Sequence, residues 1–235
     1  LDSTRSAALR DVLYDYIRLW APEQEALLSA LLPHATVGLA TAIVEIFAEI
    51  ATPAAIKGLE AAFQGGHLEV KLLVLAKMAE PEGASRSTLD RVREEVTRLL
   101  AEADAEGRAR VLELVTRFHV VAAGPSVARG IQADEFHELS LVERRLWLST
   151  LFDLSKSRGE ALSVELLSRR RLLSSEAVEQ TRALAAEMLA QTDSAEAIEA
   201  LTTASKQRWG TSTAVKEAAT QAPAQIEARG GSGPA

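Results

Sequence analysis

One apolar phrase occurs near both ends of this 235-residue chain, and its interruptions restrict the fold more than any other feature. The stretch IATPAAIKGLEAAFQGGHLEVKLLVLAKMA runs from Ile50 to Ala79. It breaks at Thr52-Pro53 and again at Gly65-Gly66-His67, and each time it restarts with helical apolar spacing. Proline fits the first turn of a helix, where a missing N–H costs little, and glycine commonly follows a helix end. The phrase therefore predicts helices joined by tight turns.

The second copy of the phrase runs from Thr192 to Ala222 and keeps the same apolar positions. When Ile56 is aligned with Ile198, four further apolar pairs follow: Leu59 with Leu201, Ala62 with Ala204, Ile46 with Met188, and Phe47 with Leu189. Three extra residues near RWG bring Val70-Lys71 onto Val215-Lys216. A weaker copy places Leu112, Val115, Phe118, Val127 and Ile131 on Val44, Phe47, Ile50, Leu59 and Phe63, and a degraded copy spans Leu148 to Leu167. The period is about 35 to 40 residues, which is typical of stacked helical repeats.

Helical spacing continues through almost the whole chain, without convincing strand alternation. The predicted helices are about thirteen in number and span residues 5–20, 23–32, 37–50, 53–64, 68–79, 88–103, 107–118, 123–133, 139–155, 159–172, 175–191, 195–209 and 213–222. Ile56, Leu59 and Phe63 are expected to face inward. Ser140 and Glu143 are spaced as a capping box for the helix that follows them. The sequence predicts an all-α protein.

The phrase around residues 42–79 resembles the HEAT-repeat family and its close armadillo-type relatives, in the bacterial form. The resemblance is good over residues 42–79, fair over 183–222 and only patterned between. It implies a right-handed α-solenoid of stacked antiparallel helix pairs with about 12 to 13 helices. Residues 1–36 would form N-terminal capping helices, 37–222 the HEAT-like repeats, and 223–235 a flexible linker. A compact helical bundle is the alternative, since it could carry the same periodicity.

The composition indicates which class of partner and which cellular compartment to expect. A net charge of −7 and a pI near 5.3 argue against a nucleic-acid surface, which is normally basic. The absence of cysteine excludes disulfides and thiol chemistry and suits a reducing cytoplasm. The sequence has neither a signal peptide nor an apolar run near the roughly 20 residues that span a bilayer. A bias toward arginine and alanine indicates a bacterial genome. We expect a cytoplasmic piece of a larger bacterial protein.

The stretch ADEFHELS most resembles a set of metal ligands, because it gathers Asp134, Glu135, His137 and Glu138. It lacks the second histidine of HExxH, and Glu135 and His137 would point apart on a helix, so a solvated loop is favoured. The four histidines have no Ser or Asp partner at a spacing that suggests a triad. The sequence therefore gives no catalytic, cofactor-binding or metal-binding residue.

Two further features have a structural and a functional interpretation. Arg169, Arg170 and Arg171 end one helix, where they could grip an acidic peptide or a phosphate. Complementation of the helix dipole and pairing with Glu165 or Glu176 is the favoured interpretation. Among the tryptophans, Trp147 is expected to be buried. For Trp20 and Trp209, at helix ends, core packing is favoured over a role as an exposed anchor.

The HEAT resemblance implies a non-enzymatic protein–protein interaction or scaffolding domain. In such solenoids the second helix of each pair lines an extended concave surface. Carried onto this chain, the partner-binding positions are Lys57, Glu60, Gln64, Arg129, Gln132, Glu165, Arg169, Glu199 and Lys206. Their mixed charge favours a protein partner, and charge reversal at Arg129 and Arg169 is predicted to weaken its capture.

Two other classes of function stay open at this stage. A HEAT-like enzyme could be a bilin lyase, for which no signature is present, or an alkylpurine DNA glycosylase that uses Trp147, Asp153 and Arg158. The net charge of −7 opposes the glycosylase alternative. A structural module that stacks end to end is the third possibility. We expect no cofactor, nucleic acid or membrane partner, and self-association is possible.

Overall fold

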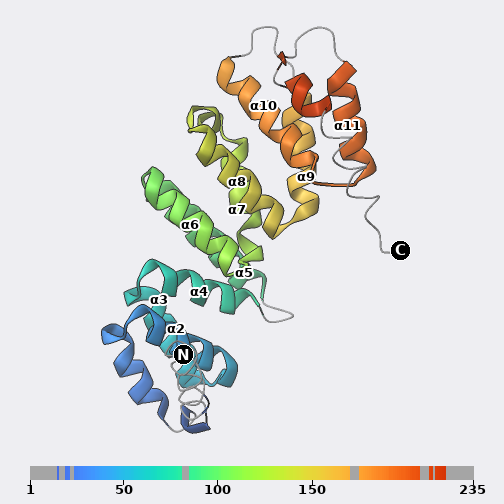
Figure 1. The fold of residues 1–235 in the computed structure, drawn as a ribbon. Helices are drawn as coiled ribbons and strands as arrows, with labels where there is room; N and C mark the ends of the chain where they lie inside the picture. The colour runs from blue at the N-terminus through green and yellow to red at the C-terminus, as the bar shows by residue number, and fades with distance from the viewer. Residues whose placement is uncertain are drawn as a thin grey trace, which may run out of the picture. The chain divides into compact units, whose positions relative to one another are not determined.

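The computed structural model is helical throughout the residues that it describes (Figure 1). Those residues are 15, 19–21, 24–80, 85–169, 175–206, 212–213 and 215–220, and no strand occurs among them. The prediction of an all-α protein is confirmed. Arg170, Arg171, Trp209 and the predicted linker at 223–235 lie outside the described residues.

Ten α-helices have defined bounds in this part of the chain. They are α2 (Val37–Ile50), α3 (Pro53–Gly65), α4 (Leu68–Ala79), α5 (Arg86–Glu102), α6 (Ala105–Arg117), α7 (Gly124–Gln132), α8 (Leu141–Leu154), α9 (Lys156–Ser168), α10 (Glu176–Leu189) and α11 (Ala195–Lys206). Three 3-10 helices lie between them: η1 (Leu32–His34), η2 (Val121–Ala123) and η3 (Asp134–Glu138). Residues 24–31 and 215–220 are also helical.

Side-chain N-caps explain where most helices begin. A Ser, Thr or Asp oxygen accepts a hydrogen bond from the backbone N–H three residues later at Thr36, Thr52, Ser85, Asp104, Ser140, Ser175, Ser194 and Ser212. Each such bond satisfies one of the N–H groups that a helix start leaves unpaired. The caps account for the agreement between predicted and observed helix starts.

The predicted capping box at Ser140 is only half formed. Ser140 Oγ accepts from the Glu143 N–H at 3.2 Å, as expected. The Glu143 carboxylate instead accepts two hydrogen bonds from the Arg108 guanidinium, at 3.0 and 3.1 Å. Glu143 therefore links α8 to α6, a cross-helix partner that local spacing could not reveal.

The turn after α3 ends the helix at Gly65, as predicted, but without a left-handed residue. Gly66 has φ −78° and ψ 161°, which is extended backbone. A side chain at Gly66 would overlap the Ala62 carbonyl oxygen, which accepts the Gly66 N–H at 2.8 Å. Glycine is required there by close approach. The left-handed residue of this region is Ala51, with φ 47°, at the end of α2.

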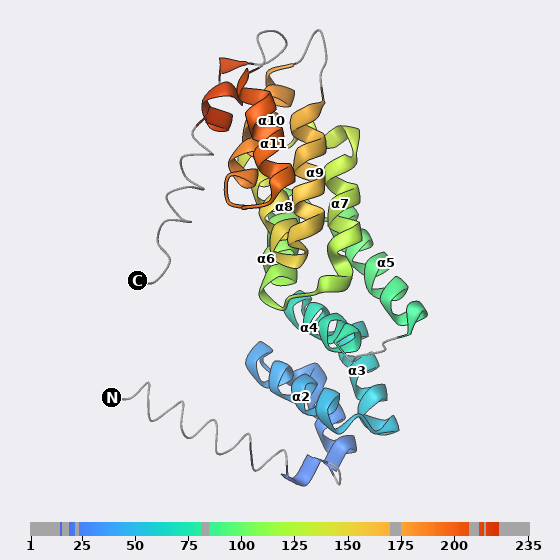
Figure 2. The same cartoon turned by 90° about the vertical axis from the view of Figure 1, so that its right-hand side faces the viewer.

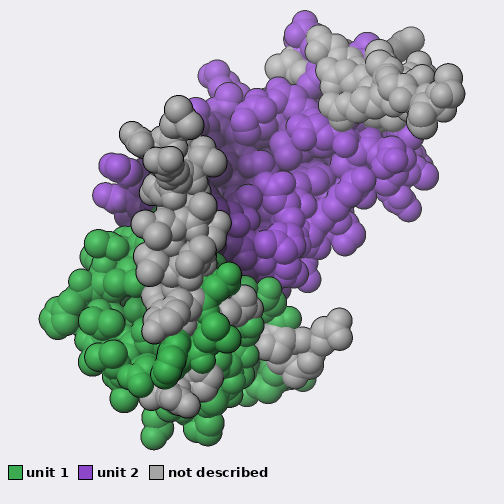
Figure 3. Space-filling model, turned by 60° about the horizontal axis from the view of Figure 1, so that its bottom comes forward, with its two compact units in different colours: residues 1–92 green, residues 93–235 purple. Residues whose placement is uncertain are grey.

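The chain divides into two compact units, residues 1–92 and 93–235, and the division falls inside α5 (Figure 3). The domain boundaries predicted after residues 36 and 222 mark the extent of the sequence repeats and not the compact units of the structure. They therefore stay predictions. Each unit is described by itself below.

Unit 1 is built on α2, which packs against both α3 and α4, while η1 packs on α2 and α3. Its core includes Ile43, Phe47, Leu72 and Leu75, all at most 1% exposed. Leu59 and Phe63 face inward as predicted. The prediction for Ile56 is wrong, because its side chain is 49% exposed. In the first turn of α3 the inward position is taken by Ala55, which is fully buried, so the buried stripe runs through Ala55, Leu59 and Ala62 and leaves Ile56 beside it.

Unit 2 arranges its helices in two layers. One layer holds α6, α8 and α10, in which α8 packs against both of the others (Figure 1). The second layer holds α7, α9 and α11, in which α9 packs against both of the others (Figure 2). The layers are joined by contacts of α8 with α7 and α9, and of α10 with α9 and α11. Each helix from α6 to α10 therefore packs against the next helix in the chain, the one after it, or both.

The aligned copies of the phrase agree in burial at every apolar position. Leu59 and Leu201, Ala62 and Ala204, Phe47 and Leu189, and Val70 and Val215 are all buried, whereas Ile56 and Ile198 are both exposed. In the weaker copy, Leu112, Val115, Val127 and Ile131 are buried like their counterparts. Even the N-caps correspond, since Thr52 and Ser194 occupy equivalent positions. Residues that are aligned between the copies in sequence are therefore equally buried in the structure.

Glycine allows close helix packing opposite an aromatic ring. A Cβ atom added to Gly58 of α3 would overlap the ring of Phe47 in α2, and one added to Gly130 of α7 would overlap Trp147 in α8. Phe47 is fully buried and Trp147 is 5% exposed, so neither ring has free space into which to move. The absence of a side chain at these glycines sets the distance between paired helices.

We predict that Gly58→Ala lowers the free energy of unfolding by about 1–3 kcal/mol, because overpacking displaces a buried ring. Gly65→Ala in the same helix is the matched control, since nothing lies within 4 Å of its added Cβ. That control should be neutral or stabilising by up to about 1 kcal/mol, as expected from helix propensity. Urea unfolding followed by circular dichroism measures both. Equal effects of the two substitutions would contradict the packing argument.

A buried ion pair ties α10 to the segment that follows α11. Arg182 is 1% exposed, and its guanidinium donates to Glu179 at 2.8 Å and to the Leu167 carbonyl at 3.2 Å. The Glu179 carboxylate also accepts the Ser212 N–H at 3.0 Å. Burial alone raises the pKa of Glu179, but the hydrogen bonds from Arg182 and Ser212 and the charge of Arg182 outweigh it. The net pKa lies below the ordinary 4.5.

A carboxyl whose pKa is lower in the folded state stabilises the fold above its unfolded pKa and loses that contribution as pH falls through the folded pKa. We therefore predict that Glu179→Gln costs about 1.5–3 kcal/mol at pH 7, in the range for hydrogen bonds to charged groups. The difference from wild type should shrink as pH falls below about 4.5. Urea unfolding of both proteins between pH 3.5 and 7 measures it, and a pH-independent difference would refute this role of Glu179.

Candidate interaction surface

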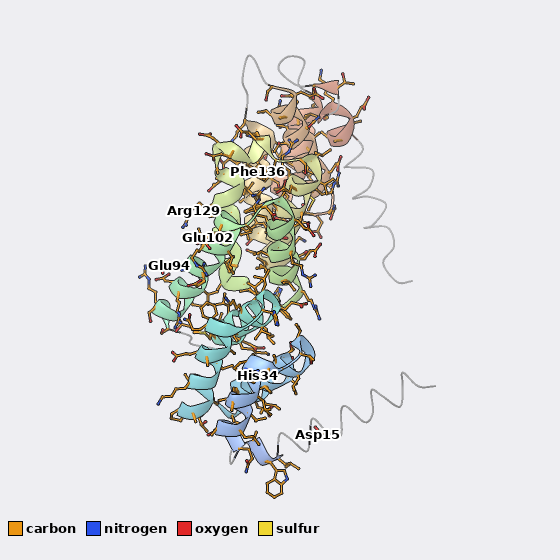
Figure 4. The ribbon with its side chains drawn as sticks, turned by 90° about the vertical axis from the view of Figure 1, so that its left-hand side faces the viewer. Asp15, His34, Glu94, Glu102, Arg129 and Phe136 are labelled. Carbon is orange, nitrogen blue, oxygen red and sulfur yellow. The ribbon has the colours of Figure 1, made fainter. Side chains whose placement is uncertain are left out.

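The layer formed by α7, α9 and α11 carries six of the nine predicted partner-binding residues. Arg129 and Gln132 on α7, Glu165 on α9, and Glu199 and Lys206 on α11 are exposed, and Arg169 at the end of α9 is half-buried. Figure 4 shows the Arg129 side chain at the outer edge of the ribbon. The remaining three, Lys57, Glu60 and Gln64, are exposed on α3 of unit 1. The structure thus groups the predicted positions of unit 2 in one layer.

A groove of about 330 Å³ lies between α9 and α11 on this layer. Val164, Leu167 and Ser168 of α9 form one wall, and Glu196, Glu199, Ala200, Thr203 and Ala204 of α11 form the other. Leu167 and Ala204 are buried, whereas Glu196, Glu199 and Thr203 are exposed. The groove therefore has an apolar floor and a polar rim.

Only Glu199 of these lining residues was predicted from the sequence. Glu196 and Thr203 lie three residues before and four residues after Glu199, so helical spacing alone places all three on one face of α11. That spacing could have identified them. The contribution of Val164 and Leu167 depends on how α9 packs beside α11, which no local pattern gives.

Charged residues of α9 beside the groove and those of α11 at its rim differ in whether they form ion pairs. Arg169 donates to Glu165 at 2.7 Å along α9, so the favoured interpretation of this arginine, pairing with a nearby glutamate, is confirmed. Within the described part of the chain, neither Glu196 nor Glu199 forms an ion pair. The rim of the groove on α11 is thus acidic, and no described cation is paired with its carboxylates.

The ADEFHELS stretch forms the 3-10 helix η3, and the predicted solvated loop is wrong in one respect. Phe136 is 1% exposed and anchors η3 to the core, as its place among the helices in Figure 4 suggests. His137 Nδ1 lies 3.2 Å from Thr181 Oγ1 of α10. Asp134, Glu135 and Glu138 are exposed. Among the described residues, no three His, Asp or Glu side chains are grouped as a metal site requires.

A buried arginine lies beside η3 and has a structural role. Arg144 of α8 is 3% exposed and donates to the Ala177 carbonyl at 2.6 Å, to Thr181 Oγ1 at 2.6 Å and to Gln180 Oε1 at 2.9 Å. Burial lowers the pKa of this guanidinium, although arginine stays charged at any ordinary pH. These contacts join α8 to α10, and the group is closed to ligands.

Of the three residues that the glycosylase alternative would use, Trp147 is buried and the other two are at the surface. Trp147 is 5% exposed and its ring packs against Gly130, which confirms the predicted burial and leaves no face on which a base could stack. Asp153 and Arg158 are exposed. The favoured interpretation of Trp20 is wrong, because this side chain is 50% exposed at the surface of unit 1.

Unit 1 contains a smaller hollow of about 50 Å³ among η1, α3 and the start of α4. Its lining is mostly alanine, glycine and other small or apolar residues, and His67 is its single ionisable side chain. This hollow offers little for specific recognition. The α9–α11 groove is the better candidate site.

Comparison of the chain with protein-family models, curated proteins and solved structures gave no significant match. Over the part of the chain that the structure describes, no helix combines the length and apolar character needed to cross a bilayer.

Proposed function

We propose that this chain is a non-enzymatic protein–protein interaction domain of a larger bacterial protein, built as a right-handed HEAT-like α-solenoid. It binds a partner protein in the cytoplasm through the exposed faces of α7, α9 and α11. The observation that carries the proposal is the α9–α11 groove, which lies on the layer where the sequence places the partner-binding residues.

Two features of the packing support the solenoid. Helices of unit 2 pack against the next helix or the one after it, which is how stacked repeats bury their apolar stripes. Positions aligned between copies of the phrase also agree in burial. A bundle with a single central core does not require its apolar positions to be equivalent at a fixed period.

The character of the exposed layer supports a protein as the partner. Arg129 and Lys206 lie on the same layer as Glu165 and Glu199, so the surface carries both signs of charge. A groove with an apolar floor and a polar rim is typical of protein interfaces, whereas a polyanion needs a continuous basic surface.

We predict that the double variant Arg129→Glu and Arg169→Glu captures its main partner at least about tenfold more weakly than wild type. Reversing two surface charges removes electrostatic complementarity and adds repulsion. The measurement is affinity capture from a soluble lysate of the organism that encodes the chain, followed by quantitative mass spectrometry. Circular dichroism establishes that the variant is folded.

The matched control is the double variant Arg98→Glu and Arg110→Glu on α5 and α6. Both arginines form ion pairs within their own helix, as Arg169 does, but neither belongs to the α7–α9–α11 layer. Capture should stay within about twofold of wild type for this control. If both double variants retained the same partner as wild type, the layer would not be the binding surface.

We also predict no measurable affinity for duplex DNA at low salt, because the net charge is −7. A gel-shift or fluorescence-anisotropy titration at about 20 mM salt tests this, since low ionic strength exposes weak electrostatic binding. Binding in the micromolar range would instead favour a glycosylase-type function.

A further inference from the structure

We propose that the α9–α11 groove binds a segment of the partner that presents a lysine or arginine beside aliphatic residues. This inference rests on the proposed function, and it specifies the chemistry of the partner. The groove combines an apolar floor, an acidic rim and a hollow shaped by small residues.

The floor suits an aliphatic chain. Leu167 and Ala204 are 2% exposed and close the bottom of the groove, and Val164 and Ala200 are half-buried beside them. The two alanines leave the space that larger side chains would fill. With a volume of about 330 Å³, the groove is at the lower end of the range for ligand pockets and holds a few side chains.

The rim suits a cationic head group. Glu196 and Glu199 are three residues apart on α11, so their carboxylates lie on one face of the helix. Neither forms an ion pair with a described residue. Some exposed acids of unit 2 do, namely Glu113 with Arg110, Glu165 with Arg169, Glu187 with Arg145, and Asp193 with Lys156. Others, such as Asp134, Glu135 and Glu138 of η3, form no ion pair with a described residue either. What distinguishes Glu196 and Glu199 is therefore their position at the rim of the groove.

Lysine and arginine match both parts of the groove at once. Their aliphatic stems pack along apolar surface while the charged ends reach outward. A stem lying over Val164 and Ala200 would bring its ammonium or guanidinium to the carboxylates of Glu196 and Glu199. Charge complementarity and apolar contact therefore favour the same occupant.

The repeat indicates that these acids are not needed for folding. In the alignment that pairs Ile56 with Ile198, Glu196 corresponds to Ala54 and Glu199 to Lys57. The surrounding core positions are buried in both copies, and Lys57 and Glu199 are both exposed. The first copy thus forms the same helix with the opposite charge at this position, so Glu196 and Glu199 are free to serve recognition.

The test uses a phage-displayed library of random 12-residue peptides selected on the full 235-residue chain. Recovered peptides are synthesised, and their affinities are measured by fluorescence anisotropy at about 50 and 500 mM salt, because screening weakens exposed charge pairs. Methyl resonances of Val164 and Leu167 report whether a bound peptide lies in the groove.

Three variants are compared with wild type after their folding is checked by circular dichroism. Glu196→Gln with Glu199→Gln removes the charge of the rim, and Ala200→Leu fills the hollow. Glu106→Gln with Glu113→Gln on α6 is the control. Glu106 is the second residue of α6 just as Glu196 is the second residue of α11, so effects on the helix N-terminus are matched.

We expect recovered peptides to carry lysine or arginine next to aliphatic residues and to shift the Val164 and Leu167 methyl resonances. Their dissociation constants should rise at least about tenfold in the Glu196/Glu199 variant and in Ala200→Leu, and less than about twofold in the control. Higher salt should weaken binding to wild type more than to the Glu196/Glu199 variant.

Three outcomes would overturn the inference. Peptides that bind without basic residues, or that bind the Glu196/Glu199 variant as tightly as wild type, would refute the groove chemistry and leave the proposed function standing. Self-association of wild type that the same variant abolishes in sedimentation would make a second copy the occupant. If no peptide is recovered and the lysate capture also yields no partner, both the inference and the proposed function fail.

Discussion

The structure depends on the fact that a short helix cannot bury its apolar stripe with one neighbour. In unit 2, α8 packs against α6, α7, α9 and α10, and its residues Leu148 and Leu151 are fully buried as a result. Small residues make such close packing possible, because the Trp147 ring packs against Gly130 and the Phe47 ring packs against Gly58. Two-layer stacking follows in unit 2, where α7, α9 and α11 keep exposed residues such as Arg129, Glu165 and Glu199.

Much of the fold could be predicted because its signals are local. The N-caps Thr52, Ser140 and Ser194 directly precede the helices that they begin. Proline marks a helix start at Pro53, and glycine marks a helix end at Gly65. Apolar spacing then identified most of the buried faces. Two of the errors have a common cause, which is a neighbour distant in sequence. Glu143 pairs with Arg108 instead of completing a capping box, and Phe136 anchors a segment whose polar composition suggested a loop.

The candidate surface was predictable in position but not in shape. Helical spacing is enough to place Glu199, Arg129 and Glu165 on exposed faces, because the opposite faces are apolar. The groove exists only where α9 and α11 pack side by side with alanines between them, and Leu167 reaches it from the neighbouring helix. The small side chains of Ala200 and Ala204 therefore define the site as much as the charges do.

Packing between helices close in the chain has a consequence for how unit 2 folds and opens. Helices such as α8, α9 and α10 pack with partners one or two elements away, so contact order is low and nucleation can begin at any helix pair. Cooperativity then depends on contacts between neighbouring helices, so α11 and the helical residues 215–220 that follow it can detach without unfolding the rest. Because α11 is one wall of the groove, a local opening that releases α11 would abolish the groove while α6 to α8 remain folded. Amide hydrogen exchange would then be faster in α11 than in α8, and an occupant of the groove would slow it.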